Sequence, residues 1–479
     1  MGATAKSAVA AARSRLPWLG LSLYIAWPFV LYYSPLALPS ETSFIDLSLA
    51  TGLSALTLAA TLAVLAFARM RTGKIEVGGV GVYAAGAVTS LGILLALLCD
   101  FLLLSAAEPL IVASGAATGI GSSYIMVHYS ILYSQLDDKA IAVTYSASYF
   151  VASILYLVEL LLPAALARIL LLLFPLASLR SLNASLEQPK ATRAAQPQTP
   201  RSLLKPLAKI LVSVFVFGLI FGYQRGIMTD GIEGNAQMNS VVYFLAMAVC
   251  AITLSVLHAK RTKPISTTLL YKVATVVMAI GLVCLTYLPD GGGLVASICI
   301  AAAYITYELS VLLMLSSHAR RTKRSRLVVF SFGHAASHLG MALGVFLGMG
   351  ATAAGGLSSQ AVQTTTAAVG LLVLVAAMFM FSDIDTPLVS SRDPGAAADA
   401  TSRRAETCDK LATTYNLSPR EREVLALLLE GRNLPAIQEI LCLSESTVKT
   451  HKRHVYEKIG VHSQQELLDR ADAIERKEP

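Results

Sequence analysis

Twelve separate apolar segments constrain the fold of this 479-residue chain more than any other feature of its sequence. A helix needs about 20 apolar residues to cross the hydrocarbon core of a bilayer, and each segment is close to that length. Hydrophobic residues make up 55% of the chain and charged residues only 14%, and mean hydropathy is +0.62. These values predict an all-α protein that crosses the membrane many times. The expected spans are 16–36, 45–68, 77–99, 108–134, 139–161, 162–180, 206–224, 237–258, 267–288, 292–316, 327–349 and 360–381.

Basic residues alternate between the connections that join these segments. If the N-terminus is cytoplasmic, every second connection lies on the inner side and should be rich in Lys and Arg. The connections expected inside carry Arg69, Arg71, Lys74, Lys139, Arg180, Lys190, Arg193, Arg201, Lys205, Lys260, Arg261, Lys263, Arg320, Arg321, Lys323, Arg324 and Arg326. Those expected outside carry only Arg168 and Arg225. We therefore expect a multi-pass protein of the cell (inner) membrane with both termini in the cytoplasm.

A polar stretch divides the apolar part of the chain into equal halves. Residues 181–205 contain three prolines and separate six spans in 1–180 from six in 206–381. This arrangement resembles the major facilitator superfamily, although the first basic loop lacks the Gly/Asp-containing pattern common in its transporters. The expected domains are thus a transmembrane domain, 1–381, a cytoplasmic linker, 382–415, and a C-terminal domain, 416–479.

The C-terminal domain reads as short amphipathic helices. Ser418 is placed as an N-cap, Pro419 occupies the first helical position, and Glu421 completes a capping box. The apolar stripe Val424, Leu425, Leu428 and Leu429 follows. A later helix begins after the N-cap Ser444 and is expected to bury Val448, Val455 and Ile459. Its opposite face is cationic, as required of a helix that enters the DNA major groove.

This region resembles the LuxR-type helix-turn-helix domain. The matching residues are Leu417-Ser-x-Arg-Glu-x-Glu-Val-Leu425, Gly431, Ile437, Leu441, Ser444-Glu-x-Thr-Val-Lys-Thr-His451 and Lys458-Ile-Gly-Val461. The resemblance implies that the helix from Ser444 to Gly460 reads double-stranded DNA, and that the four-helix domain forms a homodimer through its last helix. The expected DNA-binding residues are Ser444, Ser446, Thr447, Lys449, Thr450, Lys452, Arg453 and Lys458. The expected dimerisation residues are Leu467, Leu468, Ala471 and Ile474.

A few ionisable side chains lie inside the expected spans. They are costly there, so each requires an explanation. Glu308 lies in the tenth span, His334 and His338 are one turn apart in the eleventh, and His128 lies in the fourth. One interpretation is a cavity that binds a polar small molecule or a proton; the other is hydrogen bonding between helices. A metal site is not expected, because no third ligand is visible near the two histidines.

No catalytic motif is present in the sequence. It lacks Gly-Lys-Ser/Thr, Gly-x-Ser-x-Gly and His-Glu-x-x-His motifs, and its six cysteines form no Cys-x-x-Cys pair. We therefore expect neither an enzyme nor a cofactor. The first hypothesis is a membrane-bound transcription regulator whose spans sense a small molecule. The alternative is a secondary transporter with an appended regulatory domain, and a third option is that the spans serve only as an anchor.

Overall fold

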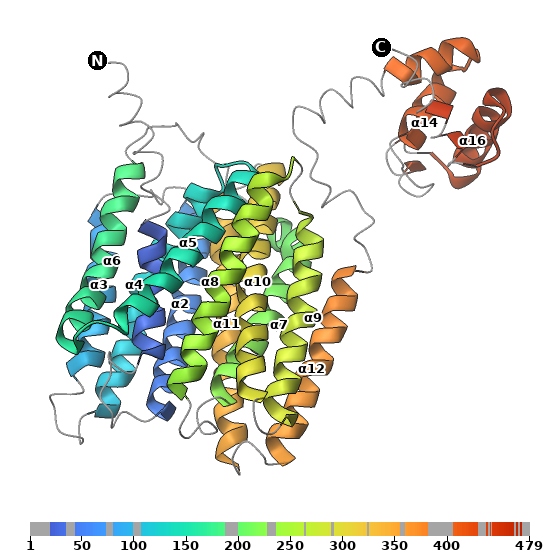
Figure 1. Cartoon of the computed structure of the whole chain (residues 1–479). Helices are drawn as coiled ribbons and strands as arrows, with labels where there is room; N and C mark the ends of the chain where they lie inside the picture. Colours follow the sequence, from blue (N-terminus) through green and yellow to red (C-terminus); the bar gives the residue numbers. More distant parts are fainter. Residues whose placement is uncertain are drawn as a thin grey trace. The chain divides into compact units, whose positions relative to one another are not determined.

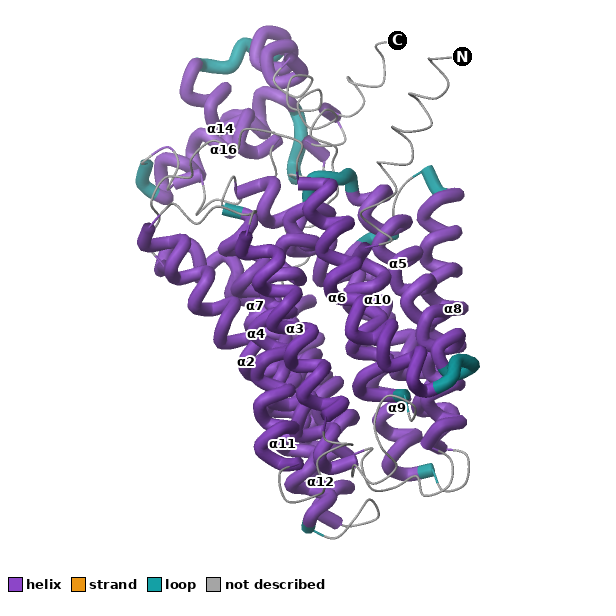
Figure 2. The backbone as a smooth tube through the Cα atoms, turned by 90° about the vertical axis from the view of Figure 1, so that its left-hand side faces the viewer, coloured by secondary structure: helices purple, strands orange, loops and turns teal. Residues whose placement is uncertain are grey.

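The computed structural model describes residues 20–34, 44–72, 80–98, 107–186, 200–227, 236–262, 265–288, 292–322, 325–354, 360–381, 406–429, 437–438, 441, 443–463, 466–467 and 470–471. Across these residues every regular element is a helix and none is a strand (Figure 2). The chain divides into two compact units, Met1–Val389 and Ser390–Pro479, which we describe separately. The predicted all-α class is therefore confirmed.

The first unit is a bundle of long helices that run side by side (Figure 1). A helix over 20–33 is followed by α2 (Phe44–Thr72), α3 (Val80–Leu98), α4 (Ala107–Tyr133), α5 (Asp138–Glu159), α6 (Ala164–Leu186), α7 (Pro200–Ile227), α8 (Ala236–Lys260), α9 (Thr267–Tyr287), α10 (Gly292–Thr322), α11 (Arg326–Ala353) and α12 (Gln360–Phe381). Among the described residues, nine helices, α2 and α4 to α11, are long and apolar enough to cross a membrane. Each of the twelve expected spans overlaps one of the twelve helices of this unit, and the count of twelve membrane crossings stays a prediction.

Glycine allows several helices in this unit to touch backbone to backbone. On α7 and α11, glycines recur every fourth residue, at 218, 222 and 226 and at 340, 344 and 348. A Cβ atom added to Gly222 would lie 2.0 Å from the carbonyl oxygen of Met341, and one added to Gly344 would lie 2.0 Å from that of Leu219. Small residues in such a repeat are a known means of close helix packing in membranes.

The first half of the bundle uses the same device around α4. A Cβ atom at Gly119 would lie 2.2 Å from the carbonyl oxygen of Ser54 on α2, and one at Gly121 would lie 2.5 Å from that of Ala85 on α3. Both glycines therefore allow α4 to pack closely against its two neighbours. In the described residues, every glycine whose added Cβ would come within 3 Å of a backbone atom packs against a helix of its own half. Each half is thus tightly built internally.

Contacts between the two halves rely mainly on side chains. Helix α2 packs on α11, and α5 packs on α8. At the first of these interfaces, Gly52 faces the flexible ring of Phe346; at the second, Ser255 donates a hydrogen bond to the carbonyl of Val143 at 3.0 Å. Side-chain contacts of this kind can rearrange more easily than close contacts between helix backbones. The bundle is therefore built as two halves, each joined internally by close backbone contacts, that meet at a seam formed by α2 with α11 and by α5 with α8.

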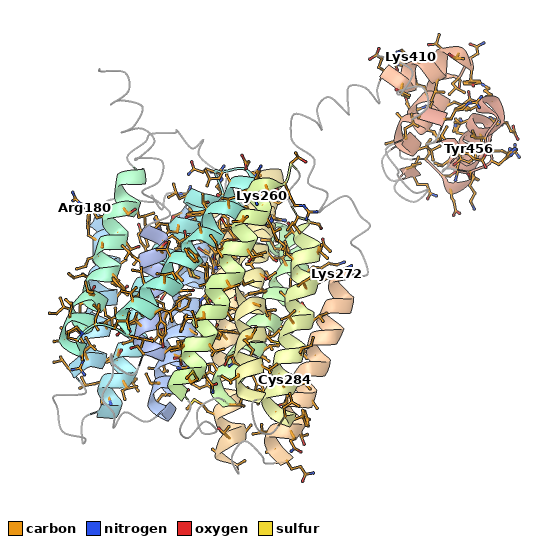
Figure 3. All side chains as sticks on the ribbon, in the orientation of Figure 1. Arg180, Lys260, Lys272, Cys284, Lys410 and Tyr456 are labelled. Atoms are coloured by element: carbon orange, nitrogen blue, oxygen red, sulfur yellow. The ribbon has the colours of Figure 1, made fainter. Side chains whose placement is uncertain are left out.

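Basic side chains gather at one end of the bundle. Figure 3 labels Arg180, Lys260 and Lys272 near the same end, whereas Cys284 lies further along α9 toward the other. This distribution agrees with the alternation of basic connections along the sequence, which is the pattern expected of a membrane protein whose basic end faces the cytoplasm.

The second unit is a small helical domain with its own core. Its main described helices are α14 (Pro419–Leu429) and α16 (Glu445–Ile459). Residues 406–414, which the sequence analysis placed in the linker, form a further helix, and Cys408 and Leu411 on it are buried in the core of this unit. The domain fold thus begins earlier in the chain than the predicted boundary at residue 416, because two apolar residues one turn apart complete its core.

Candidate functional site

Helix α14 begins as its sequence predicts. The backbone N–H of Ser418 donates to the Glu421 carboxylate at 2.7 Å, and the N–H of Glu421 donates to the Ser418 hydroxyl at 3.4 Å. This reciprocal pair is the expected capping box, which satisfies two backbone donors at the helix start. The predicted stripe of Val424, Leu425, Leu428 and Leu429 is buried. Helix α14 therefore supplies a fixed platform for α16.

Helix α16 has well-defined ends and one buried face. The Ser444 hydroxyl accepts a hydrogen bond from the N–H of Thr447 at 3.3 Å, which confirms the predicted N-cap. Gly460 ends the helix with φ of +75°, a left-handed conformation that favours glycine. Val448, Val455 and Ile459 are buried, as predicted. The helix is thus held in one rotational orientation, which determines the side chains that face outward.

The exposed face of α16 carries four of the predicted DNA-binding residues. Ser446, Lys449, Thr450 and Arg453 are all exposed and recur at intervals of one, three and four residues. This spacing places them in one stripe along the helix, opposite the buried face. We call these four residues the exposed stripe. Its hydroxyl and cationic groups are the types that bind phosphate oxygens and base edges.

Each cation of the exposed stripe has an acidic partner one turn away. Lys449 pairs with Glu445 at 2.7 Å, and Arg453 pairs with Glu457 at 3.6 Å. These pairs are mostly solvent-exposed, so each contributes little to stability and can be exchanged for a phosphate contact. The Lys449 ammonium also holds the pKa of the Glu445 carboxyl below its usual range. Because a glutamate lies beside each of its two cations, the exposed stripe has little net positive charge. A low net charge disfavours tight non-specific DNA binding.

The other predicted DNA-binding residues have contacts inside the domain. The Ser444 hydroxyl lies 2.7 Å from that of Thr447, and the Lys452 ammonium lies 5.1 Å from the centre of the Tyr456 ring, which Figure 3 labels. Lys458 donates to the Glu421 carboxylate at 2.6 Å. Their DNA-binding roles stay predictions. For Lys458 the structure adds a role that the sequence analysis missed, which is to join α16 to α14.

Glu421 lies at the centre of this joint. Its side chain is only 6% exposed and accepts hydrogen bonds from Lys458 and from the N–H of Ser418, and the Nδ1 atom of His454 lies 3.6 Å away. The hydrogen bond from Lys458 and those from Ser418 hold the pKa of Glu421 at about 2, well below its usual value. The Glu421 carboxylate is therefore charged at neutral pH. Through Lys458 it holds α16 against α14 and leaves the exposed stripe free.

The predicted dimerisation residues divide into two groups. Leu467 and Ala471 are buried in the core of the domain itself. Leu468 and Ile474 lie outside the described residues. The two buried residues stabilise the domain fold, so a dimer surface on the last helix stays a prediction that depends on the other two.

In the membrane unit, two of the predicted ligand residues, Glu308 and His334, have different hydrogen-bond partners. Glu308 on α10 is 9% exposed and accepts a hydrogen bond from the Tyr145 hydroxyl on α5 at 3.2 Å. His334 on α11 lies 2.8 Å from the Ser130 hydroxyl on α4, through its Nε2 atom. Both contacts join the two halves. His334 thus fits the alternative interpretation, hydrogen bonding between helices, whereas Glu308 lies among aromatic rings that the sequence analysis did not single out.

The remaining two histidines hydrogen-bond to their own helices. The Nδ1 atom of His128 lies 2.6 Å from the carbonyl oxygen of Tyr124, and that of His338 lies 2.9 Å from the carbonyl oxygen of His334. Across the described part of the chain, no group of three His, Cys, Asp or Glu side chains is placed to hold a metal ion. These histidines therefore supply no further direct contact to Glu308.

The two halves are also tied together at both ends of the bundle. At the start of α5, Asp138 forms an ion pair with Arg320 of α10, which also donates to the carbonyl of Leu136 at 3.3 Å. At the other end of the bundle, Arg225 of α7 donates to the carbonyl of Tyr32 in the helix over 20–33 at 2.7 Å. We call these contacts the Arg320 tie and the Arg225 tie.

Comparison with known proteins identifies the C-terminal part. The profile of the family described as "Bacterial regulatory proteins, luxR family" matches residues 415–471. The uncharacterized response regulatory protein YgeK of Escherichia coli is 37% identical over 68 residues, which are 13% of this chain and 46% of that protein. The probable transcriptional regulatory protein NarL of Mycobacterium tuberculosis is 48% identical over 58 residues, 12% of this chain and 24% of that protein. The chain thus spans less than half the length of these relatives.

Solved structures match the membrane unit. The human organic anion transporter MFSD10 superposes with a TM-score of 0.54 and 12% identity, over 77% of this chain and 99% of that one. The Escherichia coli fucose:proton symporter FucP superposes with a TM-score of 0.51 and 14% identity, over 77% of this chain and 98% of that one. At such identities the likeness concerns the fold alone. Residues 415–471 therefore form a LuxR-family helix-turn-helix DNA-binding domain, carried on the same chain as a membrane unit whose fold is like that of these two transporters.

Proposed function

We propose that this protein is a membrane-embedded transcription regulator whose membrane unit senses a small molecule and controls DNA binding by its helix-turn-helix domain. The observation that carries the proposal is the exposed stripe on α16, on a domain of the LuxR family that shares its chain with a transporter-like bundle. In this proposal the protein lies in the cell membrane with both termini in the cytoplasm, and the DNA-binding domain acts as a homodimer.

Removing the two cations of the exposed stripe tests the DNA-binding surface. Operators are first located from genome-wide DNA occupancy of the full-length protein, and affinity is then measured by gel shift with protein in lipid nanodiscs. We expect Lys449→Ala with Arg453→Ala to weaken operator binding at least about tenfold, since each phosphate or base contact contributes about 1 kcal/mol or more. The slope of log affinity against log salt concentration should fall by about 1.8 if both side chains contact phosphate.

A matched control removes two cations from α14. Arg420 pairs with Glu423 and Arg422 pairs with Asp409, and all four side chains are exposed. Arg420→Ala with Arg422→Ala makes the same change in net charge but leaves the exposed stripe intact, so affinity should change less than threefold. Equal losses in the two double variants would show that net charge, and not the stripe, determines binding.

Control of DNA binding requires two conformations of the membrane unit with different affinities for the ligand. The two halves and the ties at the two ends of the seam support such a pair of conformations, because either end can open while the other stays closed. The Arg320 tie is half-exposed, with each side chain 31% exposed, so its loss should shift this equilibrium modestly.

Asp138→Asn is therefore expected to shift the two conformations toward opening at this end by roughly fivefold, or about 1 kcal/mol. Spin-label distances between the α4–α5 and α10–α11 connections in nanodiscs would measure the populations. Asp137→Asn is the matched control, since Asp137 is the N-cap of α5, accepts from the N–H of Ala140, and asparagine caps a helix equally well. Identical populations in wild type and Asp138→Asn would exclude the Arg320 tie from conformational control.

A second candidate function is secondary transport. The observation that favours it is the buried Glu308 carboxylate between α5 and α10, within a transporter fold. Flux of a labelled solute into proteoliposomes, lost in Glu308→Gln, would establish transport. Ligand-dependent DNA occupancy without such flux would leave sensing as the function of the membrane unit.

A further inference from the structure

The surroundings of Glu308 form a distinct constellation of side chains. On α10, Tyr304 and Glu308 are four residues apart, and on α5, Tyr145 and Tyr149 are four residues apart, so each pair lies on one face of its helix. The two faces meet: Tyr145 donates to the Glu308 carboxylate, and the rings of Tyr149 and Tyr304 have centres 6.1 Å apart. Phe221 of α7 stacks on Tyr304 with ring centres 4.4 Å apart. We call these five residues the tyrosine–carboxylate cluster.

The acid of this cluster has no cationic partner in the described part of the chain. Among the described residues, Glu308 has one hydrogen-bond partner, the neutral Tyr145, and no ion pair. A carboxylate removed from water is unfavourable unless it is protonated or meets a cation. Tyr145 and Tyr304 are only partly buried, so part of each side chain remains accessible beside the acid. The site therefore lacks the positive charge that would complete it.

The aromatic side chains of this region already hold one cation elsewhere. The Arg225 guanidinium lies 4.3 Å from the centre of the Tyr33 ring. Tyr33 contacts Phe244, Phe244 contacts Phe29, and Phe29 contacts Tyr149, with ring centres 5.5, 4.8 and 6.4 Å apart. The same run of rings thus has a cation of the protein near one end and an acid without a cation near the other. Aromatic faces attract cations because of their negative π surfaces.

We propose that the tyrosine–carboxylate cluster binds a small organic cation, in which Glu308 neutralises the charge and the partly buried Tyr145 and Tyr304 contact it. The inference rests on the proposed sensing function, for which it names the class of ligand. The proposed ligand is a cation, whereas MFSD10 is an organic anion transporter. The positive charge of the ligand is inferred from this chain's own residues. A quaternary ammonium or a protonated amine with apolar substituents meets these requirements.

Binding of defined cations to the full-length protein in nanodiscs tests the inference. Tritiated tetraethylammonium and tetraphenylphosphonium are measured by equilibrium dialysis, with empty nanodiscs subtracted, and tetraphenylborate serves as an anion of matched size. We expect saturable binding of at least one cation and none of the anion. Glu308→Gln should weaken cation binding at least tenfold, and Tyr304→Leu roughly 2- to 30-fold, the range expected for a lost cation–π contact.

Two controls separate binding from folding. Tyr304→Phe keeps the ring and should change affinity less than threefold. Glu159→Gln alters another buried acid of the membrane unit, which accepts from the Ser34 hydroxyl at 3.1 Å, and should leave affinity unchanged. Saturable binding of neither cation between pH 6 and 9, equal binding of tetraphenylborate, or wild-type affinity in a monodisperse Glu308→Gln protein would each overturn the proposal; the first would leave a proton as the partner of Glu308.

The regulatory proposal is tested separately in cells that carry the wild-type protein or the Glu308→Gln variant. Genome-wide DNA occupancy is compared in cells with and without the bound cation. Cation binding that depends on Glu308 but does not change occupancy would support the ligand site and contradict control of DNA binding. If the protein occupies discrete DNA sites but binds neither cation, the result would contradict the ligand site and leave the DNA-binding function intact.

Discussion

Glu421→Gln is expected to destabilise the DNA-binding unit by about 2 kcal/mol at pH 7. Glutamine still accepts the hydrogen bond from the N–H of Ser418, so the capping box is retained and only the charge opposite Lys458 is lost. A pKa reduced from 4.5 to about 2 corresponds to roughly 3 kcal/mol, and we discount this value because Lys458 is 40% exposed and partly solvated. Urea unfolding of the compact unit 390–479, followed by circular dichroism, measures the change.

The same variant makes a prediction for pH. Because the pKa of Glu421 is lower in the folded state, its contribution is fully present above the unfolded value of about 4.5 and is lost as pH falls toward 2. The difference in unfolding free energy between wild type and Glu421→Gln should therefore be constant above about pH 5.5 and shrink steadily between pH 4.5 and 2. A difference that persists unchanged at pH 2 would show that the charge is not responsible.

Glu423→Gln is the matched control on the same helix. Glu423 pairs with Arg420 at 2.7 Å, but both side chains are exposed, so its loss should cost less than about 0.5 kcal/mol. Lys458→Met completes a double-mutant cycle with Glu421→Gln, and the coupling energy isolates the pair. The cycle also bears on the predicted phosphate contact of Lys458, since reduced DNA binding in Lys458→Met would then arise in part from a loosened α16.

The local structure of the DNA-binding unit was predictable because short-range rules determine it. Caps at Ser418 and Ser444 and the buried stripes of α14 and α16 depend on residues within one or two turns, and all are confirmed. What the sequence did not reveal is pairing at long range. Glu421 and Lys458 are 37 residues apart, and nothing local in either helix distinguishes this pair from the exposed pairs of the same domain.

In the membrane unit, spacing identified candidates but not their neighbours. Hydropathy located the helices, and burial cost drew attention to Glu308. The sequence alone does not single out the tyrosines, because only the approach of α5 to α10 brings two tyrosine faces to one acid. Conversely, the sequence suggests a cavity that His334 and Glu308 line together, whereas the partner of His334 is Ser130. The sequence cannot show which helix a polar face meets.

Two alanine substitutions on α11 should change the stability of the membrane unit in opposite directions, because only one of them falls at the glycine contact with α7. Gly344→Ala places a Cβ atom 2.0 Å from the Leu219 carbonyl oxygen and 2.6 Å from the Tyr223 nitrogen. Both are backbone atoms of a packed helix, so relief requires α7 and α11 to separate, and we expect a loss of about 3 kcal/mol. The free energy of unfolding by SDS in mixed micelles measures it.

Gly350→Ala, on the same α11, meets nothing within 4 Å of its new Cβ atom. Alanine there only removes backbone freedom from the unfolded chain, so stability should rise by up to about 1 kcal/mol. Both variants add one methyl group to the same helix. Hydrophobicity or helix propensity alone would therefore change the free energy of unfolding in the same direction in both. Opposite signs require that backbone contact at Gly344 holds the second half together as one firm unit, which is the property that lets a ligand between the halves act on both. A stabilised Gly344→Ala protein would show that α7 and α11 are not in backbone contact, and the halves would then lack the rigidity that ligand control of a tethered DNA-binding domain requires.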